Sequence, residues 1–139
     1  FFTAGNERLI VQYQGWNMAL FVCYDVRFPV WLRNVDNEYD ILLIVANWPQ
    51  SRSYAWKQLL IARAIENSCY VCGVNRIGED GTQLKYSGDS MILDMKGYPL
   101  VSARPGENEI ITTELSLSKL QSYRQNFPFW RDNDKFLLQ

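Results

Sequence analysis

The chain has 139 residues, of which 47% are hydrophobic and 21% charged, and its formal net charge is −1. This length suits one domain with a sizeable core, and the near-neutral charge gives no electrostatic case for binding nucleic acid or an anionic membrane. No apolar run approaches the roughly 20 residues that cross a bilayer, so no membrane-spanning segment is expected. The odd number of cysteines, three, argues against a disulfide framework, and we expect reduced thiols in the cytoplasm.

Four strands are predicted in the first half of the chain. They are residues 8–13, 18–22, 40–46 and 69–75. The runs at 18–22 and 40–46 are continuously apolar, which is typical of strands buried on both faces of a sheet. Residues 24–35 predict a short helix or turn, with Pro29 near its first turn.

An amphipathic helix is predicted between the last two of these strands. Its periodic positions are Trp56, Leu59, Leu60, Arg63, Ala64 and Asn67. Ser51 or Ser53 can cap its N-terminus. The order strand–helix–strand–helix–strand favours right-handed crossovers, so the strands at 18–22, 40–46 and 69–75 should lie side by side in an α/β fold.

The second half of the chain predicts shorter elements. Loops are expected at 78–81 and 104–107, strands at 84–86, 89–94, 98–103 and 109–114, and a helix that ends near residue 126. Ser116 or Ser118 can cap this helix. The aromatic segment 127–130 lies outside any expected element and must pack on something, for which a partner subunit is a natural candidate.

Cys23 stands directly after a buried strand, where the chain turns toward its next element. A side chain on such a turn can point outward, with backbone N–H groups nearby to bind an anion. The thiol can be a nucleophile or an ordinary buried cysteine, and topology alone leaves both open. Trp48 and Arg76 follow the next two strands, and the carboxyl ends of parallel strands share one edge. Together the three residues predict a pocket for a small anionic molecule.

The absence of histidine restricts the chemistry of this pocket. It excludes Ser-His-Asp and Cys-His catalysis and the usual ligand sets of zinc hydrolases. A base for Cys23 must therefore be a carboxylate or an amine. We expect no metal and no cofactor. Arg52 and Arg63 could add positive charge, although an arginine on a helix face is usually ion-paired or solvated.

Three other patterns have simpler explanations. Cys69 and Cys72 form a C-x-x-C pair inside a strand, where residues three apart point to opposite faces, and no second pair or histidine completes a zinc site. The acidic residues of 78–81 and 132–134 lack the spacing of a calcium loop. The glycines of 78–81 precede no helix, so they do not predict a phosphate loop.

The segment from Cys23 to Pro29 resembles the nucleophile motif of the nitrilase superfamily of carbon–nitrogen hydrolases. Further segments resemble the same family: 46–49, 62–67, 75–76 and 88–90, together with Arg52, Trp56, Gly78, Asp80, Gly97 and the tail from Tyr123. Within the superfamily the chain is most similar to the bacterial omega-amidase-type proteins. The resemblance runs from about Ala4 to the end of the chain.

This resemblance implies a four-layer α–β–β–α sandwich, of which residues 1–139 would form the C-terminal half. The family uses a cysteine nucleophile, a glutamate base and a lysine, with a second glutamate supporting them, and its glutamates and lysine precede the cysteine. Only Cys23 is carried over, because Glu7 lacks the family context and no lysine precedes Lys57. A start at Phe1 without methionine also leads us to expect a fragment. A half-sandwich should expose an apolar face.

The implied function is hydrolysis of a small amide that also carries a carboxylate, such as 2-oxoglutaramate, in a cytoplasmic homodimer. Cys23 would form the thioester, the backbone N–H of Tyr24 would bind the oxyanion, and Trp48, Arg52 and Arg76 would bind substrate. The alternative is a catalytically incomplete fragment that acts as an interaction domain through its aromatic tail.

Overall fold

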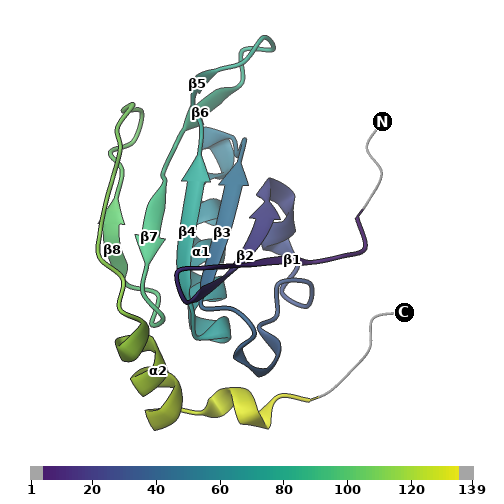
Figure 1. Ribbon diagram of the computed structural model, residues 1–139. Helices are drawn as coiled ribbons and strands as arrows, with labels where there is room; N and C mark the ends of the chain where they lie inside the picture. The colour runs from purple at the N-terminus through teal and green to yellow at the C-terminus, as the bar shows by residue number, and fades with distance from the viewer. Residues whose placement is uncertain (1–4, 135–139) are drawn as a thin grey trace.

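A computed structural model of the chain describes residues 5–134, whose main sheet is mixed and has helices packed against it (Figure 1). The sheet has six strands in the order β1-β2-β3-β4-β7-β8. The strands are β1 Leu9–Tyr13, β2 Trp16–Val22, β3 Ile41–Ala46, β4 Tyr70–Asn75, β7 Met91–Leu93 and β8 Pro99–Ser102. The α/β class is confirmed. Phe1, Phe2 and Ala4, on which two expectations rested, lie outside the described residues.

The predicted neighbours β2, β3 and β4 lie side by side and run parallel. Helix α1, Ser53–Asn67, covers one face of these strands (Figure 1). Its Trp56 and Leu60 are fully buried there. Gly73 on β4 makes this close approach possible, because a Cβ at that position would lie 2.4 Å from a Leu60 methyl.

The opposite face of the sheet is covered only in part. At one end, helix α2, Leu117–Asn126, buries Leu120 against Ile41 and Tyr70. At the other end the paired valines of β2, β3 and β4 are exposed. They are Val22, Val45 and Val74, with exposed fractions of 61%, 54% and 50%. The prediction of burial on both faces is therefore wrong for this end of the strands, and the expected exposed apolar face is present.

The two long helices begin differently. Ser116 caps α2 as predicted, because its hydroxyl accepts a hydrogen bond from the backbone N–H of Lys119 at 3.3 Å. The prediction of a serine cap on α1 is wrong, since Arg52 holds the cap position and no side chain caps the helix. A short 3-10 helix, Gln50–Arg52, leads into α1 instead and already carries the chain in a helical direction.

Two segments differ from the predicted loops and strands. The expected loop at 78–81 includes strand β5, Ile77–Glu79, which pairs with β6, Lys85–Ser87, in a separate hairpin beyond the carboxyl ends of β3 and β4 (Figure 1). Residues 109–114 do not form the expected strand. Their β-type composition is insufficient because no strand of residues 5–134 pairs with them, and Ile110 is 96% exposed.

The aromatic segment after α2 forms a further 3-10 helix, Phe129–Asp132. Phe127 stacks at 5.2 Å from Phe129 and 6.2 Å from Tyr123, centroid to centroid, yet remains half-exposed. Part of the tail therefore packs within its own chain. Across residues 5–134, each helix is too short or too polar to cross a membrane.

Candidate active site at the carboxyl edge of the sheet

Cys23 lies on a sharp turn between β2 and the 3-10 helix Cys23–Arg27. Its φ angle is +44°, a left-handed conformation that non-glycine residues adopt rarely and at a cost of about 1–3 kcal/mol. The preceding Val22 is still extended, so the chain changes direction at the cysteine itself. The half-buried thiol is thereby placed at the carboxyl end of β2.

The helix begins earlier than the proline pattern suggested. Pro29 does not stand in a first helical turn, because the helix starts at Cys23 and ends before Phe28. A residue before proline is disfavoured in the helical conformation, which explains this end. The turn is closed locally by Asp25, whose carboxylate accepts the N–H of Val22 at 3.0 Å and whose carbonyl accepts the N–H of Phe28 at 2.9 Å.

Trp48 occupies the same edge at the end of β3, but its indole is buried, with 3% of its surface exposed. The indole N–H donates to the carbonyl of Arg52 at 2.8 Å. The guanidinium of Arg27 lies 4.6 Å from the indole centroid and that of Arg52 lies 5.9 Å away. Arg27 also approaches the exposed Tyr24 ring at 5.8 Å. The indole therefore supports two guanidinium groups near the cysteine turn.

The side chain of Asn75 ties the end of β3 to that of β4. Its oxygen accepts the N–H of Trp48 at 2.7 Å, and its amide nitrogen donates to the carbonyls of Trp48 and Gly88 at 3.0 and 2.8 Å. Two backbone groups of Trp48 and one of Gly88 are thus satisfied by one buried amide. The sequence pattern did not single out Arg27 or Asn75, although both lie within segments that carry the family resemblance.

Arg76 follows β4 and packs its guanidinium 4.6 Å from the ring centroid of Tyr86 on the β5–β6 hairpin. The hydroxyl of Tyr86 donates to Asp80 at 2.8 Å. Hydrogen bonds from Thr82 and Tyr86 hold the pKa of the Asp80 carboxyl well below its usual range. The pKa of Tyr86 is raised mainly by its hydrogen bond to Asp80. Through its contact with Arg76, Tyr86 lies near the carboxyl end of β4, and no sequence pattern had indicated it.

Comparison with known proteins assigns the family of this chain. Residues 1–125 match the family model described as carbon-nitrogen hydrolase. The chain belongs to the carbon–nitrogen hydrolase family. Its fold also matches a crystal structure of a CN-hydrolase superfamily protein from Xanthomonas campestris that carries an arsenic adduct in its active site. The TM-score is 0.95 and the identity 48%, over 99% of this chain and 54% of that one.

Two curated relatives of this chain are amidases by name. The chain is 49% identical to omega-amidase YafV of Escherichia coli over 99% of its own length and 53% of that protein. It is 36% identical to 2-oxoglutaramate amidase of Bacillus subtilis, over 99% of its length and 52% of that protein. The chain therefore spans about half the length of the curated relatives it matches.

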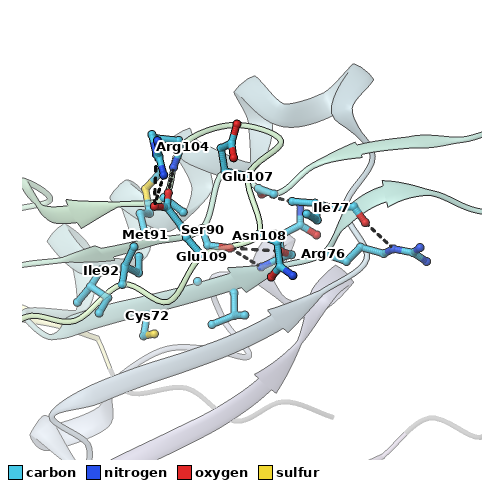
Figure 2. A pocket seen from close by; sticks show the side chains of 16 residues that line it. Cys72, Arg76, Ile77, Ser90, Met91, Ile92, Arg104, Glu107, Asn108 and Glu109 are labelled. Carbon is cyan, nitrogen blue, oxygen red and sulfur yellow. Dashed lines mark hydrogen bonds and ion pairs between the residues drawn. The ribbon is translucent and has the colours of Figure 1, made fainter.

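A cavity of about 370 Å³ in this chain lies beside the cysteine edge rather than at it. Ser90 and Ile92 line it from the sheet side, and the ion pair of Arg104 with Glu109 at 3.2 Å closes part of the other side (Figure 2). Arg76 reaches its rim, whereas Cys23 does not contribute to its walls. The cavity is therefore separate from the strained turn that carries Cys23.

All three thiols of this family member are free. Burial raises the pKa of Cys69 and of Cys72, which keeps both in the neutral thiol form. Cys69 and Cys72 therefore form no disulfide bond, and neither is an activated thiolate. Within residues 5–134, no group of three or more His, Cys, Asp or Glu side chains is arranged to hold a metal ion.

Alkylation with iodoacetamide at pH 8 should discriminate the three cysteines. We expect Cys23 to react about fivefold or more faster than Cys72, and Cys69 to stay unmodified until the protein unfolds, because the thiolate is the reacting species. Peptide mass spectrometry over time gives the three rates. Equal rates, or modification of Cys69 in folded protein, would contradict this ranking.

Proposed function

We propose that Cys23 is the nucleophile of an omega-amidase-like hydrolase that acts on a small amide carrying a carboxylate. The observation that carries the proposal is the strained turn, which places a free thiol at the carboxyl end of β2 in a member of the carbon–nitrogen hydrolase family. Backbone strain of this kind is often found at functional sites, where it sets the orientation of a side chain. Similarity to named amidases supports the same reaction class.

In the proposed reaction, the thiolate of Cys23 attacks the amide carbon and a C–S bond forms while the carbonyl oxygen becomes an oxyanion. The C–N bond then breaks, the nitrogen takes a proton, and ammonia leaves a thioester. Water attacks this thioester, a carboxylate base takes the water proton, and the product acid and the thiol are released. The backbone N–H of Tyr24 lies in the first turn of the 3-10 helix, where N–H groups lack helical acceptors, and would bind the oxyanion.

The proposed substrate site uses the positive groups of the cysteine edge. The exposed Arg52 and Arg76 approach this edge from β3 and β4, and the buried Trp48 supports Arg52. Guanidinium groups bind carboxylates with two parallel hydrogen bonds, which favours an amide that carries a carboxylate over a neutral one. The 2-oxoglutaramate amidase relative is consistent with this choice.

We further propose that the chain corresponds to the C-terminal half of such an enzyme. The glutamates and lysine that the family resemblance implies would then come from residues outside the 139 of this sequence, and the whole protein would act as a cytoplasmic homodimer. The alternative of a domain that only binds partners is not favoured, because the relatives are named amidases and the aromatic tail packs partly on its own chain.

Substrate preference tests the function directly. The full-length protein should release ammonia from 2-oxoglutaramate with kcat/KM about 100-fold higher than from an uncharged primary amide of the same length, because the lost carboxylate leaves its guanidinium partner unpaired. Enzymatic ammonia detection provides both rates. No ammonia from either amide would refute the function, and equal efficiency would refute the carboxylate site.

Two substitutions then identify the arginine responsible. If Arg52 or Arg76 binds the carboxylate, its replacement by glutamine should raise KM about tenfold with little change in kcat, which is the expected loss of a charge-assisted hydrogen bond in ground state and transition state alike. Arg104→Gln is the control, since Arg104 already pairs with Glu109. Unchanged KM in both Arg52→Gln and Arg76→Gln would exclude this assignment.

A further inference from the structure

Arg63, on helix α1, is buried directly against the turn that carries Cys23. Only 4% of its side chain is exposed. Its Nε atom donates a hydrogen bond of 2.9 Å to the carbonyl of Val26, a fully buried residue of the 3-10 helix. Its Nη1 atom pairs with Glu66 at 2.6 Å. The helix that covers the sheet is thus tied to the short helix that begins at the cysteine.

The hydrogen bond from Arg63 to Val26 stabilises a part of the backbone that is unfavourable by itself. The conformation of Cys23 is unfavourable by itself, and such residues keep it only when the surrounding structure determines it. The five-residue 3-10 helix offers hydrogen bonds of poorer geometry than an α-helix. Asp25 closes the turn from within, whereas Arg63 holds it from α1, a 15-residue helix packed against the sheet. The second tie therefore fixes the turn relative to the core.

The two hydrogen bonds of Arg63 depend on the planar, forked geometry of the guanidinium group. The Nε atom points at the Val26 carbonyl while Nη1 points at the Glu66 carboxylate, so one rigid fork serves two acceptors on different elements. A lysine presents a single ammonium and does not reproduce both contacts in this geometry. If the Val26 carbonyl lost its donor, a buried acceptor would remain unsatisfied and the turn would relax.

We propose that Arg63 is a positioning residue that sets the orientation of the Cys23 thiol by holding the carbonyl of Val26. The proposal rests on the proposed function for its kinetic consequences, while the reactivity of the thiol toward an alkylating reagent reports on it independently.

Arg124 provides a matched control within the same chain. It is also a buried arginine, and it donates to the carbonyls of Ser68 and Tyr39 and pairs with Asp40 at 2.8 Å. Tyr39 and Asp40 precede β3 and Ser68 precedes β4, so these contacts lie at the amino ends of the parallel strands, whereas Cys23 follows the carboxyl end of β2. Helix α2, which carries Arg124, lies at that amino end of the sheet (Figure 1). Arg124→Lys should therefore lower stability without changing the cysteine turn, which separates a positioning effect from a general loss of stability.

The experiment compares Arg63→Lys with Arg124→Lys in the full-length protein, at a temperature where both remain folded by circular dichroism. For Arg63→Lys we expect the alkylation rate of Cys23 by iodoacetamide to fall about threefold or more. We also expect kcat for ammonia release to fall about 10- to 100-fold with KM within about twofold, because small displacements of a reacting group have large effects. For Arg124→Lys both quantities should stay within about twofold of wild type.

Folded Arg63→Lys with wild-type alkylation and kcat would overturn the proposal, as would equal effects from Arg124→Lys. If Arg63→Lys does not fold, the variant Glu66→Gln tests the proposal in its place. Its half-exposed position tolerates the change, and loss of the charged partner should lower the alkylation rate of Cys23 about threefold. A rate within about twofold of wild type, as expected for Arg124→Lys, would refute the proposal. A wild-type protein that releases no ammonia would refute the function alone, because the alkylation comparison still tests Arg63.

Discussion

Replacing Cys23 by alanine in the full-length protein should lower ammonia release from 2-oxoglutaramate by at least about 1,000-fold. The substitution removes the sulfur atom that would form the thioester in the proposed reaction, so the covalent route is lost. The effect should appear in kcat and in kcat/KM alike. Enzymatic detection of ammonia under saturating and limiting substrate measures both.

The matched control for this prediction is Cys72→Ala. Cys72 is a free, half-buried thiol on β4, and burial raises its pKa, so we assign it no part in the reaction. Its replacement should leave kcat within about twofold of wild type. A second comparison, Cys23→Ser, keeps the size of the side chain and should be nearly as inactive, since a hydroxyl is a much weaker nucleophile than a thiolate at neutral pH. Wild-type activity in Cys23→Ala would contradict the proposal that Cys23 is the nucleophile.

Replacing Arg124 by methionine should lower the free energy of unfolding by about 3–5 kcal/mol, the largest stability effect that we expect from a single side chain. The guanidinium pairs with Asp40 at 2.8 Å, and both side chains are about one-tenth exposed. It also donates to the carbonyl of Ser68, the left-handed residue that ends α1, and to that of Tyr39. Removal leaves the buried carboxylate of Asp40 without its charged partner and the carbonyl of Ser68 without this donor, whereas the carbonyl of Tyr39 keeps a hydrogen bond from Asn34. Urea unfolding monitored by circular dichroism gives the value.

Arg104→Met is the matched control, because Arg104 forms an ion pair with Glu109 while 73% of its own side chain is exposed. Exposed pairs contribute little, so this variant should differ from wild type by no more than about 0.5 kcal/mol. The double variant Asp40→Asn/Arg124→Met should be less destabilised than the sum of its single variants, because the uncompensated charge is gone. Similar losses in the free energy of unfolding for Arg124→Met and Arg104→Met would show that the buried ion pair contributes no more to stability than the exposed one.

Much of the fold follows from local pattern. The apolar runs that became β2, β3 and β4, the helical period of α1 and the cap at Ser116 are properties of consecutive residues. They could therefore be predicted without knowledge of distant neighbours. The predictions that failed concern segments whose state depends on a partner. Residues 109–114 have strand-like composition, but a strand requires a paired neighbour.

The features of the candidate site also divide into those that local sequence predicts and those that depend on distant residues. The position of Cys23 after an apolar run, and of Trp48 and Arg76 after the next two, was predictable because parallel strands bring their carboxyl ends to one edge. The contacts that shape this edge were not. Arg63 holds the carbonyl of Val26 across 37 residues, and Asn75 holds the backbone of Trp48 across 27. Side chains that bond to distant backbone groups leave no periodic trace in the sequence.

The sequence by itself determined the α/β class, the parallel order of the central strands and the resemblance to carbon–nitrogen hydrolases around Cys23. Hydrophobic period and motif spacing are local quantities, and they suffice for these conclusions. Only the tertiary structure decided that the cysteine adopts a left-handed conformation and that Tyr86 packs against Arg76. It also decided that the valine row of the sheet is exposed. Each of these features depends on which distant segments come into contact. Hydrogen bonds and burial between residues far apart in the sequence form only when the chain has folded, so no local pattern predicts them.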